Sequence, residues 1–106
     1  MAHTILGGLE PGLARAFLTS RVYARRPHRP GVFVLETALG RFVEVYSSLE
    51  EMGRRLGSVD WFATSGSDFI SLLPRDCVVI VDRGSDHELY LDPAATVAAA
   101  QVVRGG

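Results

Sequence analysis

Apolar and polar positions follow one another in short runs, and the most regular of these runs predicts a β-hairpin. Val32–Glu36 and Arg41–Tyr46 are rich in β-branched and aromatic residues, and Gly40 between them suits the positive φ of a tight turn. In the second run Val43 and Val45 share one face, so we expect that face to meet the core. The first run is apolar on both faces, which predicts a more central place in the sheet.

Other segments also have the composition of strands. Cys77–Asp82 is a continuous β-branched run, typical of a strand covered on both faces, and His87–Leu91 alternates apolar with polar residues. The RGSD sequence between them predicts a second hairpin. Val59–Ala63 is a further predicted strand, and Arg21–Arg25 is expected to be extended. The proline-containing segment Arg26–Gly31 is predicted to be a loop.

Helix start and stop signals separate these strands. Ser48 and Glu51 have the spacing of a capping box, and Gly57 is placed to end the helix that follows. Asp92 with Pro93 is an N-cap followed by a proline at the first helical position. The predicted helices run from about Glu10 to Thr19, from Ser48 to Gly57, from Ser65 or Ser67 to Pro74, and from Asp92 to about Val103.

This order of elements predicts an α+β fold, because strands and helices interleave without strict βαβ alternation. We expect residues 1–106 to form a single domain. Its sheet should be mixed or antiparallel with about five strands, and about three to four short helices should lie mainly on one face. The residues predicted to be largely buried are Val34, Val43, Val45, Val79 and Val81.

Composition agrees with a globular domain. Apolar residues make up 47% and charged residues 22% of the chain, and no run approaches the roughly 20 apolar residues of a membrane-spanning helix. The N-terminal sequence MAHTILGGLEPG has no basic leader before a long apolar run, so no secretory signal is predicted. A cytoplasmic location without membrane association is therefore expected.

Positive charge is concentrated near the N-terminus. All 11 basic residues are arginines, and the first 30 residues hold five of them against one acidic residue. Guanidinium groups bind phosphates bidentately, so this region is a candidate anion site. The formal net charge of −1 argues against nucleic acid as the main ligand, and a solvated connector is the simpler interpretation. The candidate anion-binding residues are Arg21, Arg25, Arg26 and Arg29.

Candidate catalytic groups are scattered. A small hydrolase or transferase would have to use Ser65, Ser67 or Cys77 with His87. Neither serine lies in a GxSxG motif, and no sequence neighbour of Cys77 is an obvious base. The sequence therefore predicts no catalytic residue, although this alternative stays open.

Metal and cofactor sites are not predicted either. The three histidines never fall three or four residues apart, so no helical pair of metal ligands exists. Asp82, Asp86 and Glu88 could offer oxygens to a hard cation, but they lack the ladder of a calcium loop, and a polar hairpin turn explains them. Hydroxyls at Thr64–Asp68 could cradle an anion at a helix N-terminus, but Asp68 would repel it, so helix capping is favoured.

The run TALGRFVEVYSSLEEMGRRLG, followed by a helix led by Ser-Gly-Ser, a VVIVD strand, a Gly turn and LYLDP, resembles the SseB-like (enhanced serine sensitivity) domain family. The resemblance covers Val32 to Val97 and is strongest to small actinobacterial members. The hydroxyl pair after Tyr46 and the Asp92–Pro93 step are the matching positions. The resemblance implies a compact α+β fold of unknown biochemical role, sometimes encoded near secretion-associated genes, and it carries over no catalytic residue.

These observations predict a non-enzymatic protein-interaction or accessory module. A small domain can leave aromatic side chains partly uncovered, and we expect Tyr46, Trp61 and Tyr90 to contribute to the interaction surface. A protein partner is expected, together with a weak tendency to form a homodimer, whereas nucleic acid is not. Catalysis through His87, and anion or nucleic-acid binding through Arg21–Arg29, are the alternatives.

Overall fold

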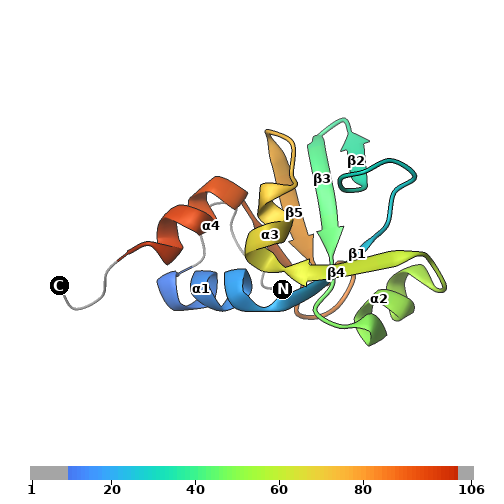
Figure 1. Ribbon diagram of the computed structural model, residues 1–106, viewed down its shortest axis with the longest axis horizontal. Coiled ribbons are helices and arrows are strands. Elements are labelled where there is room, and N and C mark those ends of the chain that lie inside the picture. The colour runs from blue at the N-terminus through green and yellow to red at the C-terminus, as the bar shows by residue number, and fades with distance from the viewer. Residues whose placement is uncertain (1–9, 103–106) are drawn as a thin grey trace.

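Six strands divide between two sheets in the computed structural model, which describes residues 10–102, and four helices alternate with them along the chain (Figure 1). In chain order the elements are α1 (Pro11–Thr19), β1 (Arg21–Arg25), β2 (Val34–Thr37), β3 (Gly40–Val45), α2 (Leu49–Leu56), β4 (Trp61–Ser65), α3 (Gly66–Ser71), β5 (Cys77–Val81), β6 (Leu89–Leu91) and α4 (Pro93–Ala100). This confirms the α+β fold class. None of the helices within residues 10–102 is long and apolar enough to cross a membrane.

The larger sheet is mixed, with the strand order β2-β3-β5-β6. β3 and β5 are parallel, and the two outer pairs are antiparallel. A parallel pair needs a long crossover, which the chain supplies through α2, β4 and α3. The prediction of a central place for the first strand is wrong, because β2 lies at the edge of the sheet.

The smaller sheet is an antiparallel ribbon formed by β1 and β4. Within residues 10–102 its backbone pairs with the larger sheet at one bridge, where Tyr23 and Tyr46 exchange hydrogen bonds of 2.9 and 2.8 Å. The ribbon therefore crosses the end of β3 instead of extending the larger sheet (Figure 1). The sequence had indicated one sheet, and this division could not be read from it.

The helix boundaries follow from their caps. Ser48 accepts a hydrogen bond from the amide of Glu51 at 3.0 Å, as predicted for α2. Ser65, rather than Ser67, caps α3 by accepting from the amide of Asp68 at 3.1 Å. Asp92 caps α4, which ends at Ala100, and the predicted end near Val103 lies outside the described residues.

The hydrophobic core lies between one face of the larger sheet and the helices. Val43, Val45 and Val79 are 1% exposed or less, as predicted, and they pack with Phe17 of α1 and Phe69 of α3. Ala99 and Ala100 of α4 pack against the same cluster, so the helices lie mainly on one face, as expected. Val34 and Val81 are only partly buried, because Val34 lies on the edge strand and Val81 ends its strand.

Residues on the other face of the larger sheet point away from α1, α3 and α4. The register places Leu35, Phe42 and Val78 in one row across three strands. Tyr90 lies in the next row, opposite Ile80. Leu35, Phe42, Val78 and Tyr90 are all partly accessible, and we refer to these four residues as the open face.

Candidate functional site

Aromatic residues gather on the outer side of the β1–β4 ribbon. Trp61 is 43% exposed, as expected, and its ring meets that of Tyr23 edge to face at a centroid distance of 5.8 Å. Arg25 is the cross-strand partner of Trp61, and its guanidinium lies 4.6 Å from the centroid of Phe33. The ribbon therefore presents rings and a cation side by side.

Tyr46 does not belong to the exposed surface, which corrects the sequence-based expectation. It is 1% exposed, because the residue pairs with Tyr23 where the two sheets meet. Its hydroxyl donates to Glu44 Oε1 at 3.0 Å. Burial, and secondarily the neighbouring Glu44 carboxylate, raise the pKa of the Tyr46 phenol.

A pocket of about 210 Å³ lies between the β1–β4 ribbon and the open face. Its lining includes Arg25 of β1, Phe33 from the segment before β2, and Leu35 of the open face. Glu44 in this pocket forms an ion pair with Arg83 that holds the pKa of the guanidinium above its usual value. The remaining lining residues are Tyr46, Arg55 and Leu56.

The four candidate anion-binding arginines do not converge. Arg21 lines a hollow that also contains Asp68, whereas Arg25 lines the pocket beside Phe33. Arg26 and Arg29 line a third, open hollow of about 500 Å³. Within the described residues no hollow gathers all four, so a single concentrated phosphate site among them has no geometric support.

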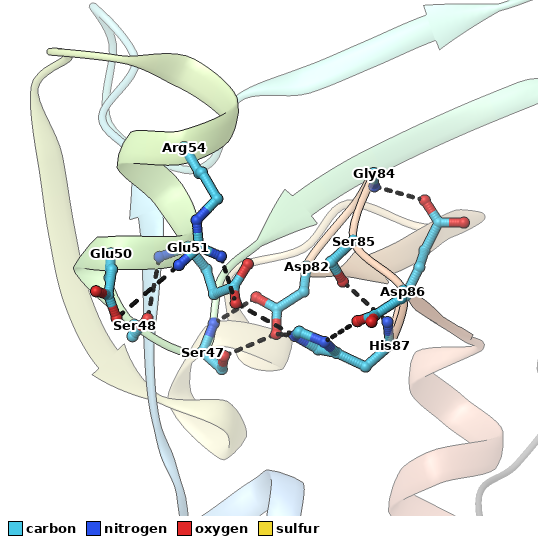
Figure 2. A network of polar contacts seen from close by, with 11 residues as sticks. Ser47, Ser48, Glu50, Glu51, Arg54, Asp82, Gly84, Ser85, Asp86 and His87 are labelled. Carbon is cyan, nitrogen blue, oxygen red and sulfur yellow. Dashed lines mark hydrogen bonds and ion pairs between the residues drawn. The ribbon is translucent and has the colours of Figure 1, made fainter.

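The most connected polar site is centred on Asp82, which follows β5 and is 2% exposed (Figure 2). Its backbone has a φ of 51°, a conformation that Asp tolerates better than most residues. Ser47 donates to its carboxylate twice, from the amide at 2.8 Å and from the hydroxyl at 2.7 Å. These bonds satisfy a buried charge that would otherwise be costly.

His87 meets carboxylates on both sides of its ring. Its Nε2 lies 3.1 Å from Asp82 Oδ2 and 3.5 Å from Glu51 Oε2, and its Nδ1 lies 3.0 Å from Asp86 Oδ1. The hydrogen bond with Asp86, followed by the charges of Asp82 and Glu51, raises the pKa of His87. Arg54 donates to the same Glu51 oxygen at 3.1 Å.

The sequence did not reveal this cluster. Glu51 was assigned to the capping box, but its carboxylate points toward His87 and Arg54 (Figure 2). The sequence explains Asp82 and Asp86 by a polar hairpin turn, and it offers His87 only as a partner for Ser65, Ser67 or Cys77. The only signal in the sequence is the acid-rich segment around His87. Glu51, the third residue of the cluster, comes from the distant helix α2.

The candidate catalytic residues are not assembled around His87. Ser65 is used as a helix cap, and Cys77 is buried at the start of β5 while His87 lies beyond the end of that strand. Burial also raises the pKa of the Cys77 thiol, which disfavours the thiolate. Ser47 is near His87 only through Asp82, whereas a nucleophile must contact its base directly.

No family model, curated protein or solved structure matches this chain. The resemblance to SseB-like domains therefore stays a prediction.

Proposed function

We propose that this chain is a non-enzymatic protein-interaction module that binds its partner through the open face and the adjoining aromatic ribbon. The observation that carries this proposal is that two accessible surfaces lie on either side of one pocket. Partly accessible apolar side chains lie on all four strands of the larger sheet, and the pocket lined by Arg25, Phe33 and Leu35 lies between this face and the ribbon, where Trp61 is 43% exposed. Adjacent apolar and aromatic residues are typical of protein interfaces.

The charge around the pocket favours an acidic partner segment. Arg25, Arg55 and Arg83 line it together with a single carboxylate, Glu44, which is already paired with Arg83. An apolar segment of the partner that carries Asp or Glu would place its rings or aliphatic side chains on the open face and its carboxylate near Arg25 and Arg55. Complementary charge of this kind would mainly determine specificity and the association rate.

The same proposal includes a cytoplasmic location and membership of the SseB-like family. With Cys77 as its single cysteine, the chain forms no internal disulfide, which fits a reducing compartment. The helix starts after the Ser47–Ser48 pair and at Asp92–Pro93 support the family resemblance, because they occur where it requires them.

The test is cross-linked affinity capture from the cell of origin, followed by binding measurements with the purified partner. Tyr90→Thr and Trp61→Thr remove large interface side chains and keep strand-forming residues. If either position is a hot spot, binding should weaken by about tenfold or more. Leu13→Gln is the matched control, because Leu13 is 46% exposed on α1, on the helical side of the sheet.

Two outcomes would count against this proposal. Equal loss of binding in Leu13→Gln and Tyr90→Thr would place the interface elsewhere. Turnover on a panel of esters, phosphoesters and thioesters that is abolished by His87→Ala would favour the enzymatic alternative.

A second copy of the chain as the occupant of the open face would produce concentration-dependent sedimentation that Tyr90→Thr abolishes.

A further inference from the structure

Three potential metal-ligating atoms converge beside α2 (Figure 2). They are Oε2 of Glu51, Oδ2 of Asp82 and Nε2 of His87, which come from a helix, the end of a strand and the following loop. All three atoms lie within 4.8 Å of one another. This arrangement joins an imidazole with two carboxylates from segments far apart in the sequence.

We propose that Glu51, Asp82 and His87 form a binding site for a divalent transition-metal ion, with Zn²⁺ as the best match. Zinc binds imidazole nitrogen and carboxylate oxygen at about 2.0 to 2.2 Å, so two ligands of a tetrahedral site are separated by about 3.4 Å. The distances from Nε2 to the two carboxylate oxygens are 3.1 and 3.5 Å. The two carboxylate oxygens lie within 4.8 Å of each other, so the three atoms are close enough to converge on one ion.

The hydrogen bonds of His87 explain why a cation suits this position. Nδ1 lies 3.0 Å from Asp86 Oδ1, so it is placed to carry a proton and donate it to that carboxylate. In the neutral ring, Nε2 then presents a lone pair to Asp82 and Glu51, both of which are acceptors. This contact is favourable only when a proton or a metal ion lies between the three atoms. A carboxylate behind a histidine is also the usual outer-shell partner in zinc sites.

The groups beside the other two ligands have opposite effects. Ser47 fixes the Asp82 carboxylate with two hydrogen bonds, and Asp82 is almost completely buried. Arg54, in contrast, donates to the Glu51 oxygen that is the proposed ligand atom, so it competes with an ion for that oxygen and its positive charge should weaken cation binding. We therefore expect Arg54→Gln to tighten metal binding.

A pocket of about 330 Å³ adjoins the cluster and is lined by Glu51 and His87 together with three arginines, Arg54, Arg55 and Arg83. It leaves space for a fourth ligand, which could be water or a carboxylate from another molecule. A bound ion would cross-link α2 to the β5–β6 loop and so stabilise this side of the fold. The nitrogen ligand favours zinc over Mg²⁺ and Ca²⁺, which prefer oxygen donors.

The experiment is calorimetric titration of the tag-free, metal-stripped chain with ZnCl₂ near neutral pH, with MgCl₂ and CaCl₂ as comparisons. We expect saturable binding of one zinc ion per chain, little response to the other cations, and a higher thermal midpoint with zinc. Titration in buffers of different ionisation enthalpy measures the protons released on binding, because metal ligands bind in their deprotonated form.

Variants identify the ligands. His87→Ala and Glu51→Gln should weaken zinc binding by about a hundredfold or more, since loss of an outer-shell partner alone weakens it by about ten- to a hundredfold. Asp86→Asn should produce the smaller loss. Matched controls are His28→Ala, at an exposed histidine, and Glu50→Gln, whose side chain is 84% exposed beside Glu51.

Both ligand variants replace side chains that are not fully buried, so they should fold, and circular dichroism checks this directly. Absence of saturable zinc binding to the unmodified chain would overturn the proposal. Equal affinity in His87→Ala and the unmodified chain would do the same. Weakening confined to the ligand variants and Asp86→Asn, with both controls unchanged, would establish the site.

Discussion

Ser47 donates two hydrogen bonds to Asp82, one from its amide and one from its hydroxyl, and so ties the turn after β3 to the end of β5. The amide of Asp82 returns a bond of 2.9 Å to the carbonyl of Val45. The parallel pair β3–β5 is thus secured at the ends of both strands. This connection holds the polar cluster in a fixed relation to the core.

The first prediction concerns this connection. Asp82→Ala should lower the free energy of unfolding by about 3 kcal/mol, because it leaves the Ser47 groups without their partner and places alanine at a positive φ. Asp82→Asn keeps the shape and tolerates the same φ, so its loss should be smaller. Urea denaturation of the metal-free chain measures both, and equal stability of Asp82→Ala and the unmodified chain would contradict the role of this carboxylate.

Two glycines in helices should respond to alanine in opposite ways. A Cβ on Gly66 would lie 2.1 Å from the carbonyl oxygen of Phe17, so Gly66→Ala must move backbone and should be strongly destabilising. A Cβ on Gly53 in α2 would meet nothing within 4 Å. Gly53→Ala should therefore stabilise the fold by about 0.5 to 1 kcal/mol. Thermal unfolding compares the pair, and the same sign for both changes would refute the packing described here.

Stability should fall at alkaline pH because of Tyr46. The pKa of its phenol is raised above the ordinary value of 10.0, with burial as the largest cause. The unfolded chain therefore loses this proton at lower pH than the folded chain does, and the stabilisation present below about pH 10 decreases as pH rises further. Urea denaturation between about pH 9 and 11 should show a shallower loss for Tyr46→Phe than for the unmodified chain. If the free energy of unfolding falls equally with pH in both proteins, groups other than Tyr46 cause the loss of stability at alkaline pH.

Nucleic acid should not bind appreciably at physiological salt. The four arginines of Arg21–Arg29 are divided among three hollows, and the chain carries a net charge of −1. Fluorescence anisotropy with labelled oligonucleotides at about 0.15 M salt should show no submicromolar binding. Tight, salt-sensitive binding that weakens when Arg25 and Arg26 are replaced by Ser would overturn this expectation.

Local signals in the sequence predicted most of the elements. The caps at Ser48 and Asp92, the turn at Gly40 and the β-branched run from Cys77 all act between near neighbours, so their effects are visible in short windows. The strand predicted from Val59 begins instead at Trp61, because its start is fixed by pairing with β1. The predicted and observed boundaries of this strand differ because its start depends on a partner strand that is distant in the sequence.

Long-range relationships were beyond sequence reasoning. The edge position of β2, the burial of Tyr46 and the separation of the ribbon all depend on which strands pair. The polar cluster could not be predicted for the same reason. Residues 82–87 have the sequence of an ordinary acidic turn, and only the fold places Glu51 of α2 beside His87. In the sequence, the helix cap fully explains Glu51 and the hairpin turn fully explains Asp82 and Asp86. Nothing in either motif therefore indicates that these residues meet.

Trp61 is the single tryptophan of the chain, and its edge-to-face contact with Tyr23 spans the two strands of the ribbon. Its fluorescence therefore gives an intrinsic optical signal from the ribbon alone, separate from the circular dichroism of the whole backbone. Because the ribbon joins the larger sheet at one bridge, the two signals need not change together on heating. An emission shift at a lower temperature than the loss of ellipticity would reveal a ribbon that opens before the core does.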